Sequence, residues 1–377
     1  MKLGTTIRHA GRELLATALV ASRRDTLETF AQMALALAGQ QIPQRAEFNP
    51  LLWELGHIGW FQEYWLMRNP QRHCGAAADP LAPRPPSAAD AWYDSSHVPH
   101  DTRWALPLPS AEQTQNDLAL QLDQTLALLK HTPEDDDALY FFRLVLLHED
   151  MHHEAALYAA QALGLPIKDP RWQVQRMAGA ASSISFGAGP WQLGYQGNGF
   201  AFDNELQAHA VALPAFDIDS RVLRWADYMP FVEATGIAPP RYLRHTDGAW
   251  QCQRWGRWHS LDPALPACHL TAHEAQAWCA WAGRRLPTEA EWERAAIERP
   301  DAFEWGQVWE WTASTFAPYA GFVAHPYRDY SAPWFSSRPV LRVASVVTQP
   351  CMRHPRYRNY FTADRNDIFA GFRSCAV

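Results

Sequence analysis

The stretch DALYFFRLVLLHEDMHHEAALYAAQALG, residues 137–164, determines how the first half of the chain folds. Its apolar residues recur at steps of three and four, which predicts one long amphipathic helix that ends at Gly164. His148 and His152 share one face of this helix, because they are four residues apart. Two imidazoles at this spacing can bind one metal ion while adjacent acids hold their second nitrogens. We therefore favour a metal site over two structural histidines at the edge of the core.

Three upstream segments show the same periodicity and predict three further helices. They are GRELLATALVASRRDTLETFAQM (residues 11–33), NPLLWELGHIGWFQEYWLMR (residues 49–68) and EQTQNDLALQLDQTLALLKH (residues 112–131). Four helices of this kind predict an up-and-down bundle over the first 165 or so residues. The proline-rich connection at 77–103 is long for a compact domain, so we expect it to face a substrate.

A metal site needs a third ligand, and His57 is the best candidate. It lies in the middle of the helix predicted at 49–68, among apolar residues where an unpartnered imidazole would be poorly placed. Facing helices of a bundle can supply one and two ligands to a shared core site. Three neutral imidazoles suit a divalent first-row metal, but imidazole alone does not choose between zinc and iron.

Two other kinds of metal site fit parts of the same pattern. His148, Glu149 and His152 match H-E-x-x-H, in which the glutamate is the general base of a zinc protease. The Gly and His that the metzincin extension needs are missing downstream of His152. A di-iron carboxylate bundle would use Glu54 with His57 and Glu149 with His152, but it leaves His148 without a role.

The composition indicates a globular protein and argues against two classes of partner. A chain of 377 residues has the length of about two domains. Its net charge of −7, with no basic run, argues against a nucleic-acid partner. No run reaches the length of about 18 apolar residues that a membrane span needs. Since the charged N-terminal segment is also unlike a signal peptide, we expect a cytoplasmic protein without a membrane partner.

The second half of the chain has a different texture after about residue 185. Short apolar pieces alternate with Gly, Pro and aromatic residues, and only 271–283 and 288–297 have clear helical periodicity. This pattern predicts a small α+β domain in which much of the chain is loop. The 18 tryptophans are consistent with the packing of such a domain and with an aromatic-lined pocket.

Several segments of both halves resemble known families. GRRLPTEAEWERAA (residues 283–296), VWEWTAS (308–314) and FAGFRSC (369–375) resemble the formylglycine-generating-enzyme-like domain, a C-type-lectin-like fold. NPLLWELGHIGWFQEYW (49–65) and HEDMHHEA (148–155) resemble the metal helices of the four-helix DinB-like domain. The combination resembles the ergothioneine sulfoxide synthases and, more closely, the selenoneine synthases; WYDSSHVPHDTRWALPLP (92–109) and PYRDYSAPWF (326–335) strengthen the closer match.

The resemblance implies a multi-domain α and α+β protein. Residues 1–170 would form the DinB-like helix bundle that carries the metal histidines, and residues 171–377 the formylglycine-generating-enzyme-like domain that binds substrate. It also implies that His57, His148 and His152 bind Fe(II), the same three residues that the spacing indicates. Tyr330 would donate a proton or an electron and is therefore the expected catalytic residue.

The family's substrate contacts map onto four further residues. Asp367, Phe369 and Arg373 correspond to residues around hercynine, and Arg103 corresponds to an arginine that binds a carboxylate of the sulfur donor. Two departures affect these positions: the family's Asn-Trp pair is Asp367-Ile368, and its RGGS stretch is RVAS at 342–345.

The implied function is that of a non-haem Fe(II), O2-dependent synthase that forms a C–Se bond on the imidazole ring of hercynine with a selenosugar. The alternative is a sulfoxide synthase that uses cysteine or γ-glutamylcysteine as a thiol donor. The loop AADAWYDSSHVPHDTRW (residues 88–104) offers two tryptophans, two serines and one arginine, which favours the sugar. A zinc hydrolase and a lectin-like binding module are the other classes.

Overall fold

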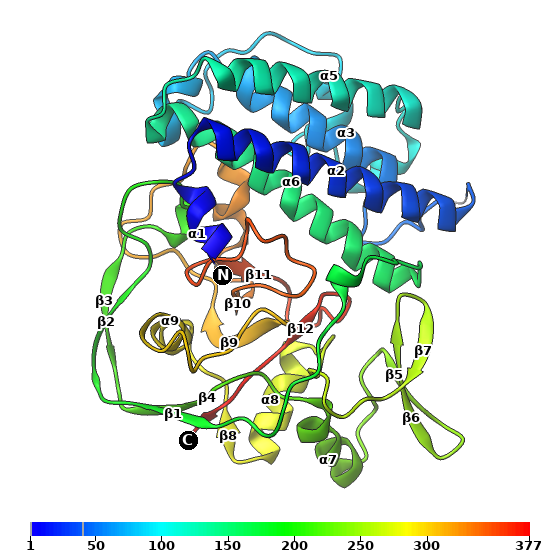
Figure 1. The fold of residues 1–377 in the computed structure, drawn as a ribbon, viewed down its shortest axis with the longest axis vertical. Coiled ribbons are helices and arrows are strands. Elements are labelled where there is room, and N and C mark those ends of the chain that lie inside the picture. Colours follow the sequence, from blue (N-terminus) through cyan, green and yellow to red (C-terminus); the bar gives the residue numbers. More distant parts are fainter. Residues whose placement is uncertain (1, 40) are drawn as a thin grey trace.

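The computed structural model describes residues 2–39 and 41–377, and it consists of a helical half and an α+β half (Figure 1). The four predicted helices are present as α2 (Arg12–Leu37), α3 (Leu51–Gln62), α5 (Ala111–Lys130) and α6 (Asp136–Leu163). α2 and α3 each pack against α5 and α6. The four predicted helices are therefore confirmed, and each of them packs against two of the others.

The ends of these helices follow from local sequence. The Asp135 side chain accepts a hydrogen bond from the Ala138 amide at 2.9 Å at the start of α6. Gly164 ends α6 at a φ of 68°, a left-handed conformation that glycine adopts without strain. α3 continues into a π-helical segment, η1 (Glu63–Met67), which the sequence pattern did not predict.

The connection between α3 and α5 covers one side of α3. It contains the short helices η2 (Arg72–Ala77), α4 (Asp90–Tyr93) and η3 (His100–Ala105). We call residues 94–105 the covering loop. Its Ser96 hydroxyl donates a hydrogen bond to Asp329 of the C-terminal half, so the loop bridges the two halves.

The C-terminal half contains two four-stranded sheets and two smaller ones. The first has the order β1 (Ser183–Phe186), β4 (Phe216–Asp219), β13 (Cys375–Ala376) and β8 (Arg284–Arg285). The second has the order β11 (Arg358–Tyr360), β10 (Pro339–Arg342), β9 (Trp309–Thr315) and β12 (Ala370–Gly371). The smaller sheets are β2 (Gly189–Leu193) with β3 (His209–Leu213), and β5 (Leu243–Thr246) with β6 (Ala249–Arg254) and β7 (Arg257–Ser260).

Three longer helices accompany these sheets, and several one-turn helices lie in the connections along the chain. The predicted helices are present as α8 (Ala272–Trp281) and α9 (Glu289–Glu298). α7 (Trp225–Thr235) was not predicted, since Pro230 inside it reads as a helix breaker. The one-turn helices are η4 (Pro170–Trp172), η5 (Asp203–Glu205), η6 (Arg328–Tyr330) and η7 (Ala332–Trp334). These elements confirm the predicted loop-rich α+β half.

The two halves share one core. A single cluster of buried apolar side chains extends from Leu147 of α6 to Trp309 of β9. The N-terminal helix α1 (Lys2–Arg8) also crosses between the halves, because Arg8 forms a buried ion pair with Glu205 of η5. The boundary at residue 170 stays a prediction, although α6 ends at 163 and the first strand begins at 183.

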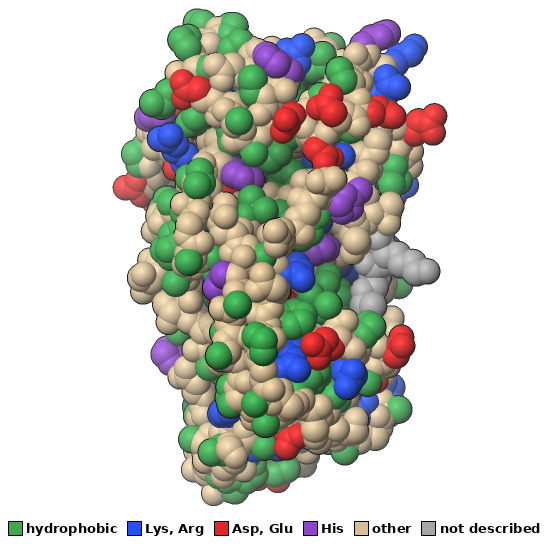
Figure 2. All heavy atoms as spheres, turned by 90° about the vertical axis from the view of Figure 1, so that its left-hand side faces the viewer, with side chains coloured by type: hydrophobic (Ala, Val, Ile, Leu, Met, Phe, Trp, Pro, Cys, Tyr) green, Lys and Arg blue, Asp and Glu red, His purple; other side chains and the backbone are tan. Residues whose placement is uncertain are grey.

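The surface of the molecule carries charges of both signs. On the face in Figure 2, acidic and basic side chains are interspersed over both halves. In the part of the chain that the structure describes, no helix has the length and hydropathy needed to cross a membrane.

Candidate metal centre

Three histidines from two helices meet where the helical half contacts the C-terminal half. α3 supplies His57, and α6 supplies His148 and His152 one turn apart. One ligand atom of each histidine lies within 4.8 Å of those of the other two. The Nε2 atoms of His148 and His152 are 3.2 Å apart. The structure thus brings together the three residues that the spacing indicated.

The other ring nitrogens of two of these histidines are held by the protein. Nδ1 of His57 donates a hydrogen bond to the Tyr93 carbonyl at 2.8 Å. Nδ1 of His152 donates to the Glu54 carboxylate. Such bonds fix the tautomer and the ring orientation, so Nε2 of each ring presents its lone pair to the shared point.

The electrostatics of the site favour neutral imidazoles. Burial lowers the pKa of His57 to about 3 and holds the pKa of His148 well below its usual range. Burial opposes the ionisation of Glu54, but the adjacent His152 outweighs it and lowers the pKa of this carboxyl to about 2. Converging imidazole nitrogens, of which those of His57 and His148 are kept neutral by burial, with a charged carboxylate behind His152, fit a divalent first-row metal ion at the point they share.

Aromatic rings hold the ligand histidines in place. Trp53 stacks on His57 with centroids 4.8 Å apart, and Phe61 stacks on His148 at 3.5 Å. Trp53, His57 and Phe61 follow one another at four-residue steps, so one face of α3 carries a ligand between two supporting rings. This spacing is visible in the sequence, and our sequence reasoning missed it.

Glu149 faces away from the histidine site. It is buried and forms an ion pair with Arg23 of α2 at 2.7 Å. The same guanidinium donates to the Leu118 carbonyl at 2.6 Å and to the Gln62 side chain at 2.6 Å. Because Glu149 is occupied by this ion pair, it is neither the general base of a zinc protease nor a ligand of a di-iron centre. The two alternatives are wrong in the role that they give to Glu149.

The remaining polar side chains of α6 are likewise bound within the protein. Asp150 accepts a hydrogen bond from Ser22 at 2.6 Å, and His153 pairs with Thr29 at 2.9 Å. Glu154 accepts four hydrogen bonds, from Trp309, Tyr158, Ser345 and Thr348. These contacts anchor α6 to α2 and to the C-terminal half.

A cavity of about 320 Å³ lies between the halves, beside the histidines. Met151, which precedes His152, forms part of its wall, together with Glu47, Arg338 and Arg365. Its aromatic lining consists of Tyr158, Tyr330, Trp334, Tyr357, Tyr360 and Phe361. Aromatic faces with a few charged groups are typical of a pocket for a small polar or cationic ligand.

Tyr330 lies in the wall of this cavity, one aromatic ring away from the metal ligands. Its hydroxyl donates a hydrogen bond to the Tyr357 hydroxyl at 3.0 Å. The ring of Tyr327 bridges the two sites, since it lies 5.9 Å from the ring of His148 and 5.9 Å from the ring of Tyr330. Burial raises the pKa of Tyr330 well above its usual range, so the phenol is protonated.

Arg103 is buried in the covering loop and does not line the cavity beside Tyr330. Its guanidinium lies 3.9 Å from the ring of Trp53 and donates to the Asn49 side chain at 2.8 Å. It also donates to the Val98 carbonyl at 3.2 Å. The role of Arg103 at a donor carboxylate stays a prediction, and these contacts place it behind the metal ligands.

The three residues predicted near the C-terminus have different surroundings. Asp367 forms an ion pair with Arg365, which lines the cavity. Phe369 packs behind the cavity, 6.2 Å from the ring of Tyr158. Arg373 is fully buried and bonded to Glu310, to the Asp219 carbonyl and to the Glu304 carbonyl. The structure thus brings Asp367 and Phe369 close to the cavity and places Arg373 in the core of the C-terminal half.

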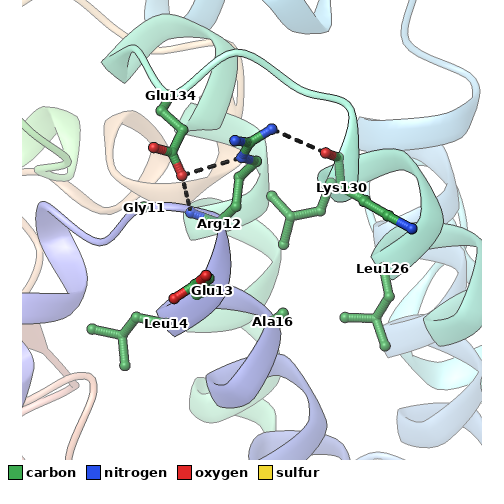
Figure 3. Close-up of a pocket in the computed structure, with 9 residues that line it drawn as sticks. Gly11, Arg12, Glu13, Leu14, Ala16, Leu126, Lys130 and Glu134 are labelled. Atoms are coloured by element: carbon green, nitrogen blue, oxygen red, sulfur yellow. Dashed lines mark hydrogen bonds and ion pairs between the residues drawn. The ribbon is translucent and has the colours of Figure 1, made fainter.

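Another cavity lies elsewhere, at the start of α2. It has a volume of about 690 Å³, and Figure 3 shows Arg12 in it, between Glu134 and the Lys130 carbonyl. Its charged groups form an exposed ion pair. Neither cavity is lined by one of the three histidines, but Met151, next to His152 in the chain, lines the cavity between the halves, and no residue next to one of the histidines lines this one.

Comparisons with known proteins cover both halves. Residues 172–307 match the model of the sulfatase-modifying factor enzyme 1-like domain. Over 96% of its length the chain is 30% identical to the hercynine oxygenase of Mycolicibacterium smegmatis, of which it covers 98%. It is 29% identical to the hercynine oxygenase of Mycolicibacterium thermoresistibile, over 98% of the chain and 96% of that protein.

A shorter match concerns the C-terminal half alone. The formylglycine-generating enzyme of Streptomyces coelicolor is 33% identical over 26% of the chain and 41% of that enzyme. Together with the domain match at 172–307, this confirms the predicted formylglycine-generating-enzyme-like domain. The DinB-like kinship of the helices stays a prediction.

Proposed function

Because the chain belongs to the hercynine oxygenase family, we propose that it is a non-haem Fe(II) enzyme that uses O2 to join a chalcogen to the imidazole ring of hercynine. We further propose that the chalcogen is the selenium of a selenosugar. The observation that carries the proposal is the convergence of His57, His148 and His152 beside an aromatic cavity between the two halves.

The proposed reaction balances with O2 as the oxidant. One imidazole C–H bond and one Se–H bond break, and one C–Se bond forms. The four electrons released by forming this bond and by oxidising selenium to the selenoxide reduce O2, so that one oxygen atom ends on selenium and the other in water. The Fe(II) that the three histidines would hold supplies the activation of O2.

The residues around the metal would hold its ligands in place. His57 is fixed by the Tyr93 carbonyl and His152 by the Glu54 carboxylate, so neither ring needs to reorient when the metal binds. A preformed ligand set of this kind favours metal binding, because the rings are already oriented towards the ion. Three protein nitrogens also leave coordination positions free for the substrates.

The cavity would bind hercynine beside the metal. The trimethylammonium group of hercynine is attracted by aromatic faces and by carboxylates, and Tyr158, Phe361 and Glu47 offer both. Its carboxylate would face Arg338, which also lines the cavity. Exclusion of water from such a pocket strengthens each of these contacts.

The residues predicted near the C-terminus would act on hercynine from behind the cavity wall. Asp367 fixes the guanidinium of Arg365, and Phe369 supports the ring of Tyr158. Arg373 would hold in place the segment that follows β12, through its ion pair with Glu310 of β9. Each of these roles is one of positioning.

Tyr330 would be the catalytic proton or electron donor. Its hydroxyl lies in the cavity wall, and the hydrogen bond to Tyr357 holds it in one orientation. Because its phenol is protonated, it has a proton to give. Once Tyr330 had given up its proton, it would accept rather than donate in this bond, with Tyr357 as the donor.

The charges of the cavity favour the sugar donor over a thiol donor with two carboxylates. Arg365 is neutralised by Asp367 at 2.5 Å. Arg338 stacks on Trp334 at 4.1 Å, and a tryptophan face suits the apolar side of a sugar ring. A γ-glutamylcysteine donor would need more free cations than this pocket provides.

One experiment tests the proposal and chooses the donor. The protein is loaded with Fe(II) without oxygen and then given hercynine, O2 and either a selenosugar or γ-glutamylcysteine, while O2 uptake and product mass are followed. We expect uptake with the selenosugar and a product heavier than hercynine by the donor plus one oxygen, less two hydrogens. Uptake with γ-glutamylcysteine alone would replace the donor, and no uptake with either would overturn the function. His57→Ala is the matched negative control.

A further inference from the structure

A chain of hydrogen bonds runs from a metal-ligand histidine to the covering loop. The Glu54 carboxylate accepts from Nδ1 of His152 with one oxygen and from the side-chain amide of Asn49 at 2.6 Å with the other. The carbonyl of the same Asn49 amide accepts from Arg103 at 2.8 Å. Asn49 thus donates to Glu54 with its amide nitrogen and accepts from Arg103 with its amide oxygen. An aspartate has no donor group and cannot take both roles.

A second path leads from the same arginine to another ligand. The guanidinium of Arg103 lies 3.9 Å from the centre of the Trp53 ring. The ring of Trp53 also stacks on that of His57, with centroids 4.8 Å apart. The indole of Trp53 is held by a hydrogen bond to the Trp92 carbonyl at 2.7 Å. One side chain of the covering loop thus supports two of the three ligand histidines.

The covering loop is in turn attached to the segment that carries Tyr330. Arg103 donates to the Val98 carbonyl within the loop, and Ser96 of the loop bonds Asp329 in η6. Asp329 precedes Tyr330 in the chain. The loop therefore contacts both the support of the metal ligands and the helix turn of the predicted catalytic tyrosine.

We propose that Glu54, Asn49 and Arg103 are positioning residues that couple the covering loop to the geometry of the metal site. In this relay, Glu54 sets the orientation and donor strength of His152, and Asn49 transmits to it the position of Arg103. The inference rests on the proposed function for the identity of the metal.

Disruption of the relay should lower the affinity for the metal by a measurable amount. A carboxylate behind a ligand histidine makes the imidazole a stronger donor and removes the freedom of the ring to rotate. Loss of such a partner typically costs about 10- to 100-fold in metal affinity. A residue that only supports the fold would lower stability without changing the coordination of the bound ion.

Co(II) is a suitable probe, because its visible absorption reports coordination geometry without turnover. We expect Glu54→Gln to bind Co(II) about 10- to 100-fold more weakly than the wild type and with a shifted spectrum. Asn49→Asp should give the same kind of shift with a smaller loss, since it keeps the acceptor for Arg103 and loses the donor for Glu54. Arg103→Gln should give the smallest shift.

Arg84→Gln is the matched control. Arg84 also stacks on a bundle tryptophan, at 4.9 Å from Trp65, and also bonds backbone carbonyls, but it does not touch the relay. Its replacement should leave the Co(II) spectrum and affinity unchanged. Wild-type spectra and affinities in both Glu54→Gln and Asn49→Asp would overturn the relay.

The coupling itself is tested by a double-mutant cycle. If the three residues act as one relay, the losses in Co(II) affinity for Glu54→Gln and Arg103→Gln should not add in the double variant. Strict additivity would overturn the coupling to the loop. A wild-type protein that binds Co(II) but does not turn over hercynine would overturn the proposed function and leave the relay standing.

Discussion

α6 carries polar side chains on two faces, and the two faces are built differently. On one face, His148 and His152 turn their Nε2 atoms towards each other and towards His57. The rest of the helix surface, which we call the second face, carries Glu149 and Glu154, which are bound by protein donors, Arg23 of α2 and Trp309 of β9 respectively. Both faces are buried, so burial alone does not distinguish them.

The difference lies in where the lone pairs point. Nitrogens that converge on one another need a cation to complete their bonding, whereas the carboxylates of the second face already have protein donors. A buried polar cluster is therefore a candidate metal site when its lone pairs converge on one point and no hydrogen-bond donor of the protein faces them. Variants on the two faces should fail in opposite ways.

The largest effect is expected on the histidine face. His148→Ala should lower turnover of hercynine by more than about a thousand-fold, since the metal activates O2 and two ligands hold it poorly. The free energy of unfolding of the metal-free protein should change far less than turnover does. Metal content and oxygen uptake, measured beside urea unfolding, check this; wild-type metal content in the variant would contradict it.

The second face should respond in stability instead. Glu149→Ala leaves Arg23 as an unpaired buried charge, which costs about 3–4 kcal/mol in the free energy of unfolding. Glu149→Gln keeps the shape of the side chain and one of the two oxygens that accept from Arg23, so it should cost less. Both variants, where folded, should bind Co(II) with the wild-type spectrum. A lost spectrum would show that Glu149 belongs to the metal site.

A smaller stability loss is expected at Glu154. Glu154→Gln keeps an oxygen in place of Oε1, the single atom that accepts all four bonds, and puts an amide donor in place of Oε2, which accepts none of them. A buried donor without a partner costs about 1–3 kcal/mol. Chemical denaturation of this variant beside the wild type measures the loss, and an unchanged free energy of unfolding would contradict it.

The smallest effect concerns a buried histidine that is not a ligand. Burial lowers the pKa of His269 to about 4, and its Nδ1 donates to the Ile368 carbonyl. The unfolded chain takes up a proton near pH 6.5, but the folded chain does so only near pH 4. The stabilising contribution is therefore complete above pH 6.5 and is lost as the pH falls towards 4, at up to about 1.4 kcal/mol per pH unit.

His269→Asn serves as the comparison for that measurement. Unfolding free energies at pH 7, 6 and 5 should fall less steeply for this variant than for the wild type. Parallel curves would mean that His269 titrates in the folded protein much as it does in the unfolded chain.

The sequence allowed the cluster of three histidines and most helices to be predicted, because both depend largely on local spacing. His148 and His152 lie on one turn, and the pattern around His57 indicates a buried helix face. α7 could not be predicted, since the penalty of Pro230 is overcome by burial of its neighbours in the core. Helix and strand bounds otherwise differ by a few residues, which local patterns do not determine.

The partners of the site could not be predicted, because they come from distant parts of the chain. Glu54 has the right spacing for a second iron ligand, yet it bonds the outer nitrogen of His152, 98 residues away. The cavity joins Met151 of α6 to Tyr330 and Tyr360 of the C-terminal half. Such contacts are set by the packing of the two halves and leave no local signal.

The ion pair between Arg8 and Glu205 has a consequence for how this protein can be divided and expressed. Arg8 precedes the long helices in the chain, but its partner lies beyond them, in the other half. A chain cut near residue 170 would leave an orphan cation in one fragment and an orphan anion in the other. We therefore expect the two halves to be more stable when they are expressed as one chain than as separate fragments.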